Sequence, residues 1–199
     1  MDELIELSRT WVKEHYSKSA EHLLKAEEWL RRMHPNASPA MLLAALTHDM
    51  ERAFPGPDSP QQDPSRGPDD AWYLQAHAER SARIVGDFLR AHQASEALVE
   101  DVVGLIRAHE VGGWPEADWV QAADSLSFLE VNVDFFLNGI DGSQGSWTLE
   151  TVRAKFDWMY WRLKISEARV WAVPLYEVAL EKLRRKEEAS RLLREKEDP

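Results

Sequence analysis

His48 and Asp49 stand side by side where an apolar helical run ends, in the segment ALTHDMER at positions 45–52. An imidazole nitrogen and a carboxylate oxygen next to each other at a helix end can bind the same metal ion. The chain contains no cysteine, so any bound metal must be held by His, Asp or Glu. Any further ligands of such a site must therefore be residues of these types elsewhere in the chain.

Further titratable residues fall on helix faces that otherwise consist of core residues. Residues three or four apart lie on one face of a helix, so His22 is aligned with Ala26 and Trp29. By the same spacing, three more residues fall on apolar faces: His77, His109 and Asp124. Taken singly, each histidine could be a core residue bonded to the backbone, and Asp124 could be the buried partner of an arginine. Burying a carboxylate without a partner is very costly, and one shared metal site would satisfy the whole set together.

Helical periodicity dominates the chain, and no convincing strand pattern is present. The sequence predicts one all-α domain over 1–199 with long loops at 53–68 and 138–146. The expected helices cover about 2–33 with a break near 16–19, 39–49, 70–92, 95–109, 115–137, 148–170 and 174–196.

Capping residues mark several of these boundaries. Ser38 followed by Pro39 is typical of a helix start, and Ser95 begins another helix in the same way. Asp69 or Asp70 caps the helix that carries His77. Because the candidate ligands are distributed over five of the expected helices, the fold must bring these helices together around one point.

Composition narrows the possible partners. The formal net charge of −11 argues against a protein that wraps a nucleic-acid backbone, which requires clustered Lys and Arg. A small phosphorylated substrate remains compatible, because a bound metal can supply local positive charge. No secretory signal is visible and no apolar run approaches the length of a membrane span. We therefore expect a soluble cytoplasmic protein that does not associate with membranes.

At this point the residues resemble the HD-domain superfamily of metal-dependent phosphohydrolases, whose signature is a His, a His-Asp doublet and a distant Asp. The matching positions are His22, His48, Asp49 and Asp124. The segments ALTHDMER and QAADSLSF resemble the family's doublet and its final Asp helix. The resemblance covers about 19–132 and implies an all-α helical bundle of the HD-domain type. The additional C-terminal helices, at about 147–197, are not part of it.

The resemblance also implies a metal centre. His77 and His109 fall where members with two metals carry extra ligands. In that arrangement Asp49 would bridge two ions. One ion would be held by His22, His48 and Asp124, and the other by His77 and His109. A single ion is the alternative, and Mn, Fe, Ni and Co are not distinguished by ligands of this type.

The activity implied is hydrolysis of a small phosphorylated molecule, possibly a nucleotide, by metal-activated water, with Asp49 and Arg52 as catalytic residues. Arg52 lies where many members carry a cation near the substrate, although it is equally compatible with a surface position at a helix end. Arg80 is a second candidate for binding phosphate. Two other readings stay open: a di-iron oxygenase of the same superfamily, and a non-catalytic binding module that contains a metal.

The remaining titratable residues and the aromatic residues are not predicted to bind a metal directly. Glu51 is expected to be solvated, and Glu110 to support a ligand or to be exposed. The other histidines, His15, His34 and His92, are expected to be structural or on the surface. Aromatic residues are concentrated in the C-terminal helices, where they indicate either core packing or the interface of a homodimer.

Overall fold

The computed structural model describes residues 2–16, 19–140 and 147–197. Within these ranges the chain forms helices and no strand, which confirms the predicted all-α class. The elements are α1 (Asp2–His15), α2 (Ala20–Met33), α3 (Pro39–Thr47), η1 (Met50–Ala53), η2 (Pro64–Arg66), α4 (Ala71–Ala91), α5 (Glu96–Ala108), α6 (Pro115–Ser127), the π-helical turn η3 (Phe128–Asn132), α7 (Val133–Gly139), α8 (Leu149–Trp161) and α9 (Ser166–Glu197).

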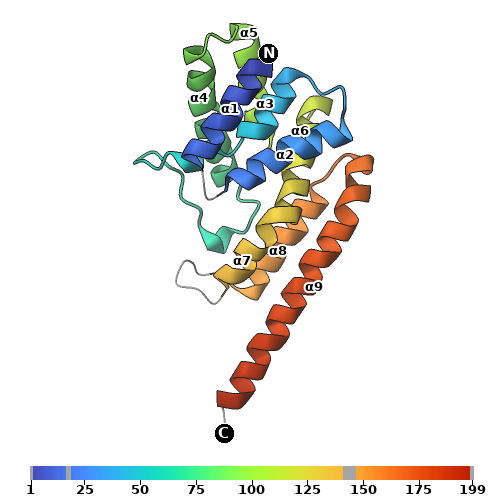
Figure 1. Cartoon of the computed structure of the whole chain (residues 1–199). Helices are drawn as coiled ribbons and strands as arrows, with labels where there is room; N and C mark the ends of the chain where they lie inside the picture. The colour runs from blue at the N-terminus through green and yellow to red at the C-terminus, as the bar shows by residue number, and fades with distance from the viewer. Residues whose placement is uncertain (1, 17–18, 141–146, 198–199) are drawn as a thin grey trace.

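Helix α3 lies at the centre of the N-terminal part of the bundle and packs against α1, α2, α5 and α6 (Figure 1). All of its residues except Pro39 are buried, because its sequence is apolar on every side. Ser38 caps it by accepting a hydrogen bond from the Met41 amide at 3.3 Å. The regular helix ends at Thr47, so His48 and Asp49 follow its last turn rather than lying within it.

Helices α4 and α5 pack against each other, as do α2 and α6. The predicted caps are present in the first pair: Asp70 accepts from the Trp72 amide, and Ser95 accepts from the Leu98 amide. The break expected near 16–19 separates α1 from α2. The loop expected at 53–68 contains one short helical turn, η2, and residues 141–146 of the second expected loop lie outside the described residues.

The predicted boundaries of the C-terminal helices are wrong. The expected break before Pro174 is absent, and the chain instead turns between α8 and α9, at residues 162–165. A proline inside a helix costs about 3 kcal/mol. Helix α9 continues through it because a stripe of buried side chains with helical spacing packs against the preceding helices; this stripe consists of Ala168, Ala172, Ala179 and Leu183. The helix expected over 115–137 is likewise divided by the π-helical turn η3.

The C-terminal end of α9 extends beyond the other helices (Figure 1). None of the described helices combines the length and the apolar composition that crossing a bilayer requires. The core is continuous from α1 to α9, and α8 packs between η3, α7 and α9. This arrangement brings Arg162, which directly follows α8, to the residues that follow α5 and to those of α6, as described below.

Candidate metal centre

The structure brings the six predicted metal ligands together in the interior. They come from different elements: His22 from α2, His48 and Asp49 from the end of α3, His77 from α4, His109 from the end of α5 and Asp124 from α6. All of these side chains are buried. Residues separated by up to about half the chain therefore meet at one point, as the apolar faces around them predicted.

Asp124 lies between two of the histidines. Its Oδ1 atom is 3.2 Å from His22 Nε2 and 3.4 Å from His48 Nε2. Asp49 approaches the other side of the cluster, with its Oδ1 atom 2.9 Å from His77 Nε2. The ring centroid of His109 is 4.8 Å from that of His48 and 5.4 Å from that of His77. The groups therefore form one continuous cluster.

Every imidazole of the cluster forms a hydrogen bond through its Nδ1 atom. His48 and His109 direct Nδ1 at the carbonyl oxygens of Ala45 and Ile106, at 2.9 and 2.6 Å. A carbonyl oxygen can only accept, so each Nδ1 carries the proton and each neutral ring keeps its lone pair on Nε2. In its neutral form, each of these two rings therefore presents an unprotonated Nε2 atom to the centre, and such a nitrogen can bind a metal.

The same arrangement holds for the other two rings. Ser127 donates its hydroxyl to the His22 carbonyl at 2.6 Å, which leaves its oxygen to accept from His22 Nδ1 at 2.9 Å. Glu51 Oε1 accepts from His77 Nδ1 at 3.0 Å. Such partners behind a ligating histidine set its tautomer and its orientation. All four rings therefore direct Nε2 to the interior of the cluster.

Two of these inward nitrogens have no hydrogen-bond partner among the described residues: His48 Nε2 and His109 Nε2. Buried polar atoms are usually satisfied, and exceptions in a native protein require an explanation. The ligand atoms lie close enough to hold an ion in three overlapping groups: His22, His48 and Asp124; His48, Asp49 and His109; and His77, His109 and Glu110. Buried groups that could hold a metal ion are therefore present.

The charges of the cluster are strongly coupled. Burial disfavours the charged forms of Asp49 and Asp124, but neighbouring cations outweigh it and hold both pKa values well below their usual range. Burial also acts against a charged His48, yet Asp124 and Asp49 raise the pKa of that ring to about 9. Burial lowers the pKa of His109 to about 4, which keeps this ring neutral.

The prediction that Glu51 is solvated is wrong. Its side chain is buried because it accepts from both His77 and Arg80, the latter at 3.0 Å. Arg80, which the sequence offered as a phosphate ligand, is mostly buried and already donates to the carbonyls of Glu51 and Phe54 and to Asp58. Arg80 therefore orients Glu51, and through it His77, instead of facing the centre.

The sequence analysis missed Arg162, which lies just beyond α8. Its buried guanidinium forms ion pairs with Asp124 and Glu110. Asp124 is therefore the buried partner of an arginine, and it also lies in a group that could hold a metal ion. Glu110 is buried, which resolves the alternative left open for it. The spacing of Lys155, Trp158 and Arg162 places them on one helix face, and this pattern of two cations beside a tryptophan could have drawn attention to Arg162.

Two cations face the cluster and are less buried than its ligands. Arg52 lies with its Nη1 atom 3.4 Å from Asp49 Oδ2, and its side chain is 40% exposed. Lys155 is half-buried, with its ammonium 4.5 Å from the ring centroid of Trp158 and 5.4 Å from that of Phe128. Within the described part of the chain no acidic group forms an ion pair with Lys155.

Burial lowers the pKa of Lys155 to about 8, with Glu110 acting in the opposite direction and the charges of Arg162 and Arg52 adding to the decrease. Two phenols also lie near these cations. Tyr73 stacks on His77 with 6.0 Å between ring centroids, and burial raises the pKa of Tyr16 to about 12, with Asp49 adding to the increase. This side of the centre is therefore suited to an anion.

The histidines outside the cluster have structural contacts, as predicted. His34 stacks on Trp119, with 5.1 Å between ring centroids and 3° between planes. His15 and His92 direct Nδ1 at backbone carbonyls within their own helices.

Comparison with known proteins found no matching family model, no matching curated protein and no matching solved structure. What can be said of function therefore depends on the chemistry of the centre and on the residues around it.

Proposed function

We propose that this protein is a metal-dependent phosphohydrolase that acts on a small phosphorylated molecule and holds one or two divalent transition-metal ions. The observation that carries the proposal is the set of four buried imidazoles with Nδ1 bonded outward and Nε2 directed inward. The resemblance of the residues around His48 and Asp124 to the HD-domain superfamily supports the same conclusion.

The residues present fit a metal. Imidazole and carboxylate ligands suit Mn, Fe, Co and Ni, and the unsatisfied Nε2 atoms of His48 and His109 would gain a partner. His22, His48 and Asp124 would hold one ion. His77 and His109 would hold a second, with Asp49 shared between the two. Such an ion lowers the pKa of water and polarises a phosphoryl oxygen, which is the chemistry that phosphate-ester hydrolysis requires.

The chain's own residues would bind and orient the substrate. Arg52 and Lys155 are cations near the cluster that are less buried than its candidate ligands, and both can donate hydrogen bonds to phosphoryl oxygens. Glu51 keeps the His77 ring in place, and Arg162 does the same for the Asp124 carboxylate. No protein nucleophile is needed, so these residues position groups and neutralise charge.

The test begins with the metal content of the purified protein, measured by elemental analysis after reconstitution. We expect one or two equivalents of a transition metal in the wild type and a loss of metal in His48→Ala. His34→Ala is the matched control, because this histidine stacks on Trp119 away from the centre and its removal should leave the metal content unchanged.

The second step measures inorganic phosphate released from a panel of phosphomonoesters, nucleotides included. Release by the wild type and by His34→Ala, but not by His48→Ala, supports the proposal. A wild-type protein that contains no metal after reconstitution contradicts it. Bound iron with substrate-dependent oxygen uptake and no phosphate release would also contradict it, in favour of the oxygenase reading.

A further inference from the structure

A pocket of about 860 Å³ opens beside the candidate metal centre. Its walls are mainly apolar and come from α4, from the segment after α5 and from the C-terminal end of α8; they include Leu74, Val111, Trp158, Trp161 and Leu163. Sites for small molecules are typically concave, mostly apolar and about 300–1,000 Å³ in volume. The size and composition of this pocket therefore suit a small organic ligand.

Two tryptophans form part of its wall. Trp161 is 63% exposed, which is unusual for so large an apolar side chain. Trp158 is flanked by cations, with the guanidinium carbon of Arg162 4.3 Å and the ammonium of Lys155 4.5 Å from its ring centroid. Flat aromatic molecules pack well against such surfaces, because stacked rings gain contact energy beyond the area that they bury.

The lining carries more positive than negative charge, although the chain as a whole has a net charge of −11. The cations are Arg107, Arg162, Lys164 and Arg169, and the acids are Asp69 and Glu110. Three of these cations are already paired with acids: Arg162 with Glu110, Lys164 with Asp118 and Arg107 with Glu79. Arg169 instead donates its Nε–H to the neutral carbonyl of Leu163 at 2.9 Å. The charge of Arg169 is therefore available to an anionic ligand.

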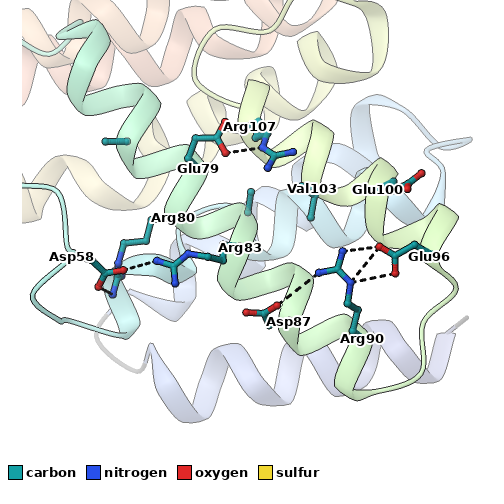
Figure 2. Close-up of a pocket in the computed structure, with 12 residues that line it drawn as sticks. Asp58, Glu79, Arg80, Arg83, Asp87, Arg90, Glu96, Glu100, Val103 and Arg107 are labelled. Carbon is teal, nitrogen blue, oxygen red and sulfur yellow. Dashed lines mark hydrogen bonds and ion pairs between the residues drawn. The ribbon is translucent and has the colours of Figure 1, made fainter.

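A second hollow, between α4 and α5, provides a contrast (Figure 2). Its volume is about 670 Å³, but its cations are occupied: Arg83 pairs with Asp58, Arg90 with Glu96, and Arg107 at its edge with Glu79. No aromatic side chain is among its lining residues. This groove therefore lacks both the apolar wall and the available charge of the pocket beside the centre.

We propose that the pocket beside the metal centre binds a small aromatic anion, with its ring against the exposed Trp161 and its negative group toward Arg169. Binding depends on these walls and not on a metal, so the inference stands whether or not the protein hydrolyses phosphate esters.

The test uses two fluorescent probes of the same shape. 1-Anilinonaphthalene-8-sulfonate is an aromatic anion, and N-phenyl-1-naphthylamine is its neutral analogue without the sulfonate. We expect the anion to bind the intact, folded chain at one saturable site, about tenfold more tightly than the neutral probe.

Variants then locate the site. Trp161→Ala should weaken binding of both probes by about tenfold, because it removes part of the aromatic wall. Arg169→Gln should weaken binding of the anion alone, since it removes the charge and keeps a hydrogen-bond donor for Leu163. Trp171→Ala is the control, because this tryptophan is also partly exposed but packs against Trp29 and Arg32, outside the pocket. Circular dichroism confirms that each variant is folded.

Three results would overturn the proposal. One is equal binding of the anion by wild type and folded Trp161→Ala. Another is binding of the neutral probe as tightly as the anion. The third is a loss of binding in Trp171→Ala, which would place the probe on the exposed surface of α9 instead.

Discussion

At the scale of single residues, each imidazole of the centre bonds its Nδ1 atom to a group behind the ring and directs its Nε2 atom into the cluster. His48 and His109 bond their Nδ1 atoms to the carbonyls of the turn that precedes them, so the helix ends themselves orient the rings. His22 and His77 depend instead on side chains of other elements, Ser127 and Glu51. This difference suggests that changes to Ser127 or Glu51 loosen only their own histidine, whereas the rings at helix ends keep their orientation.

Arg162 is expected to be the most important cation for the stability of the metal-free protein. Its side chain is 5% exposed and pairs with two buried carboxylates, Asp124 and Glu110. Arg162→Met leaves these charges without their partner, so we expect a loss of about 3–5 kcal/mol in the free energy of unfolding. Urea unfolding in the presence of a chelator measures this loss.

Arg153→Met is the matched control for that experiment. Arg153 is 52% exposed and pairs with Asp157 on the surface of α8, where an ion pair contributes at most about 1 kcal/mol. Equal midpoints and slopes for Arg162→Met and Arg153→Met would show that the buried pairing does not stabilise the fold.

Lys155 should give anion binding a dependence on pH. The pKa of this group is about 8, so the ammonium is charged below that pH and becomes neutral above it. We expect binding of inorganic phosphate to weaken as the pH rises from about 7 to about 9, measured by calorimetry. Lys155→Arg should retain binding over this range, because a guanidinium stays charged.

The variant Lys155→Met tests whether Lys155 is the group that causes the pH dependence of phosphate binding. This variant should bind phosphate weakly at every pH and show no decline across the same range, since the titrating cation is absent. A decline of the same size in Lys155→Met and in the wild type would assign the pH dependence to another group.

At the scale of elements, α3 and α5 serve the centre in the same way. Each begins at a serine cap and ends at a candidate ligand, His48 or His109; α3 is buried almost throughout, whereas α5 buries one face. Close-packed interiors transmit strain, so the position of the last turn of α3 depends on the packing of the whole helix.

The cap of α3 should therefore contribute measurably to stability. Ser38→Ala removes the acceptor for the Met41 amide, and we expect a loss of about 1 kcal/mol in the free energy of unfolding by urea. Ser19→Ala is a comparison at the start of α2, where the serine accepts no cap hydrogen bond, and its effect should be smaller. An equal effect of the two changes would argue against a stabilising cap at Ser38.

At the scale of the whole molecule, the candidate ligands join five helices that are far apart in the sequence, α2 to α6. A metal bound to them would favour the folded state, because the unfolded chain has no such site. At a metal concentration of about 100 times the dissociation constant, the stabilisation is about 2.7 kcal/mol. For a chain of this length that corresponds to a shift in Tm of roughly 5–10 °C.

A chelator should remove this stabilisation. We expect EDTA to lower the Tm of the reconstituted wild type by that amount and to leave the Tm of His48→Ala almost unchanged, as measured by differential scanning calorimetry. An equal effect of EDTA on both proteins would mean that the stabilising ion binds elsewhere.

The sequence by itself determined the all-α class, the helices from α1 to α5 and the candidate ligands. These follow from local rules: apolar periodicity defines each helix face, serine and aspartate caps define several starts, and a polar residue on an apolar face must be buried with a partner. Asp124, for example, required a cation on these grounds alone, although its partner could not be named.

Only the tertiary structure decided which groups meet. Arg162 and Lys155 lie near the centre because α8 packs beside η3. Their spacing shows that they share a helix face, but it does not show which element that face meets. Glu51 looked solvated because its partners, His77 and Arg80, lie on another helix. Pro174 stays inside α9 because packing outweighs the cost of the proline, and such packing depends on side chains that are distant in the sequence.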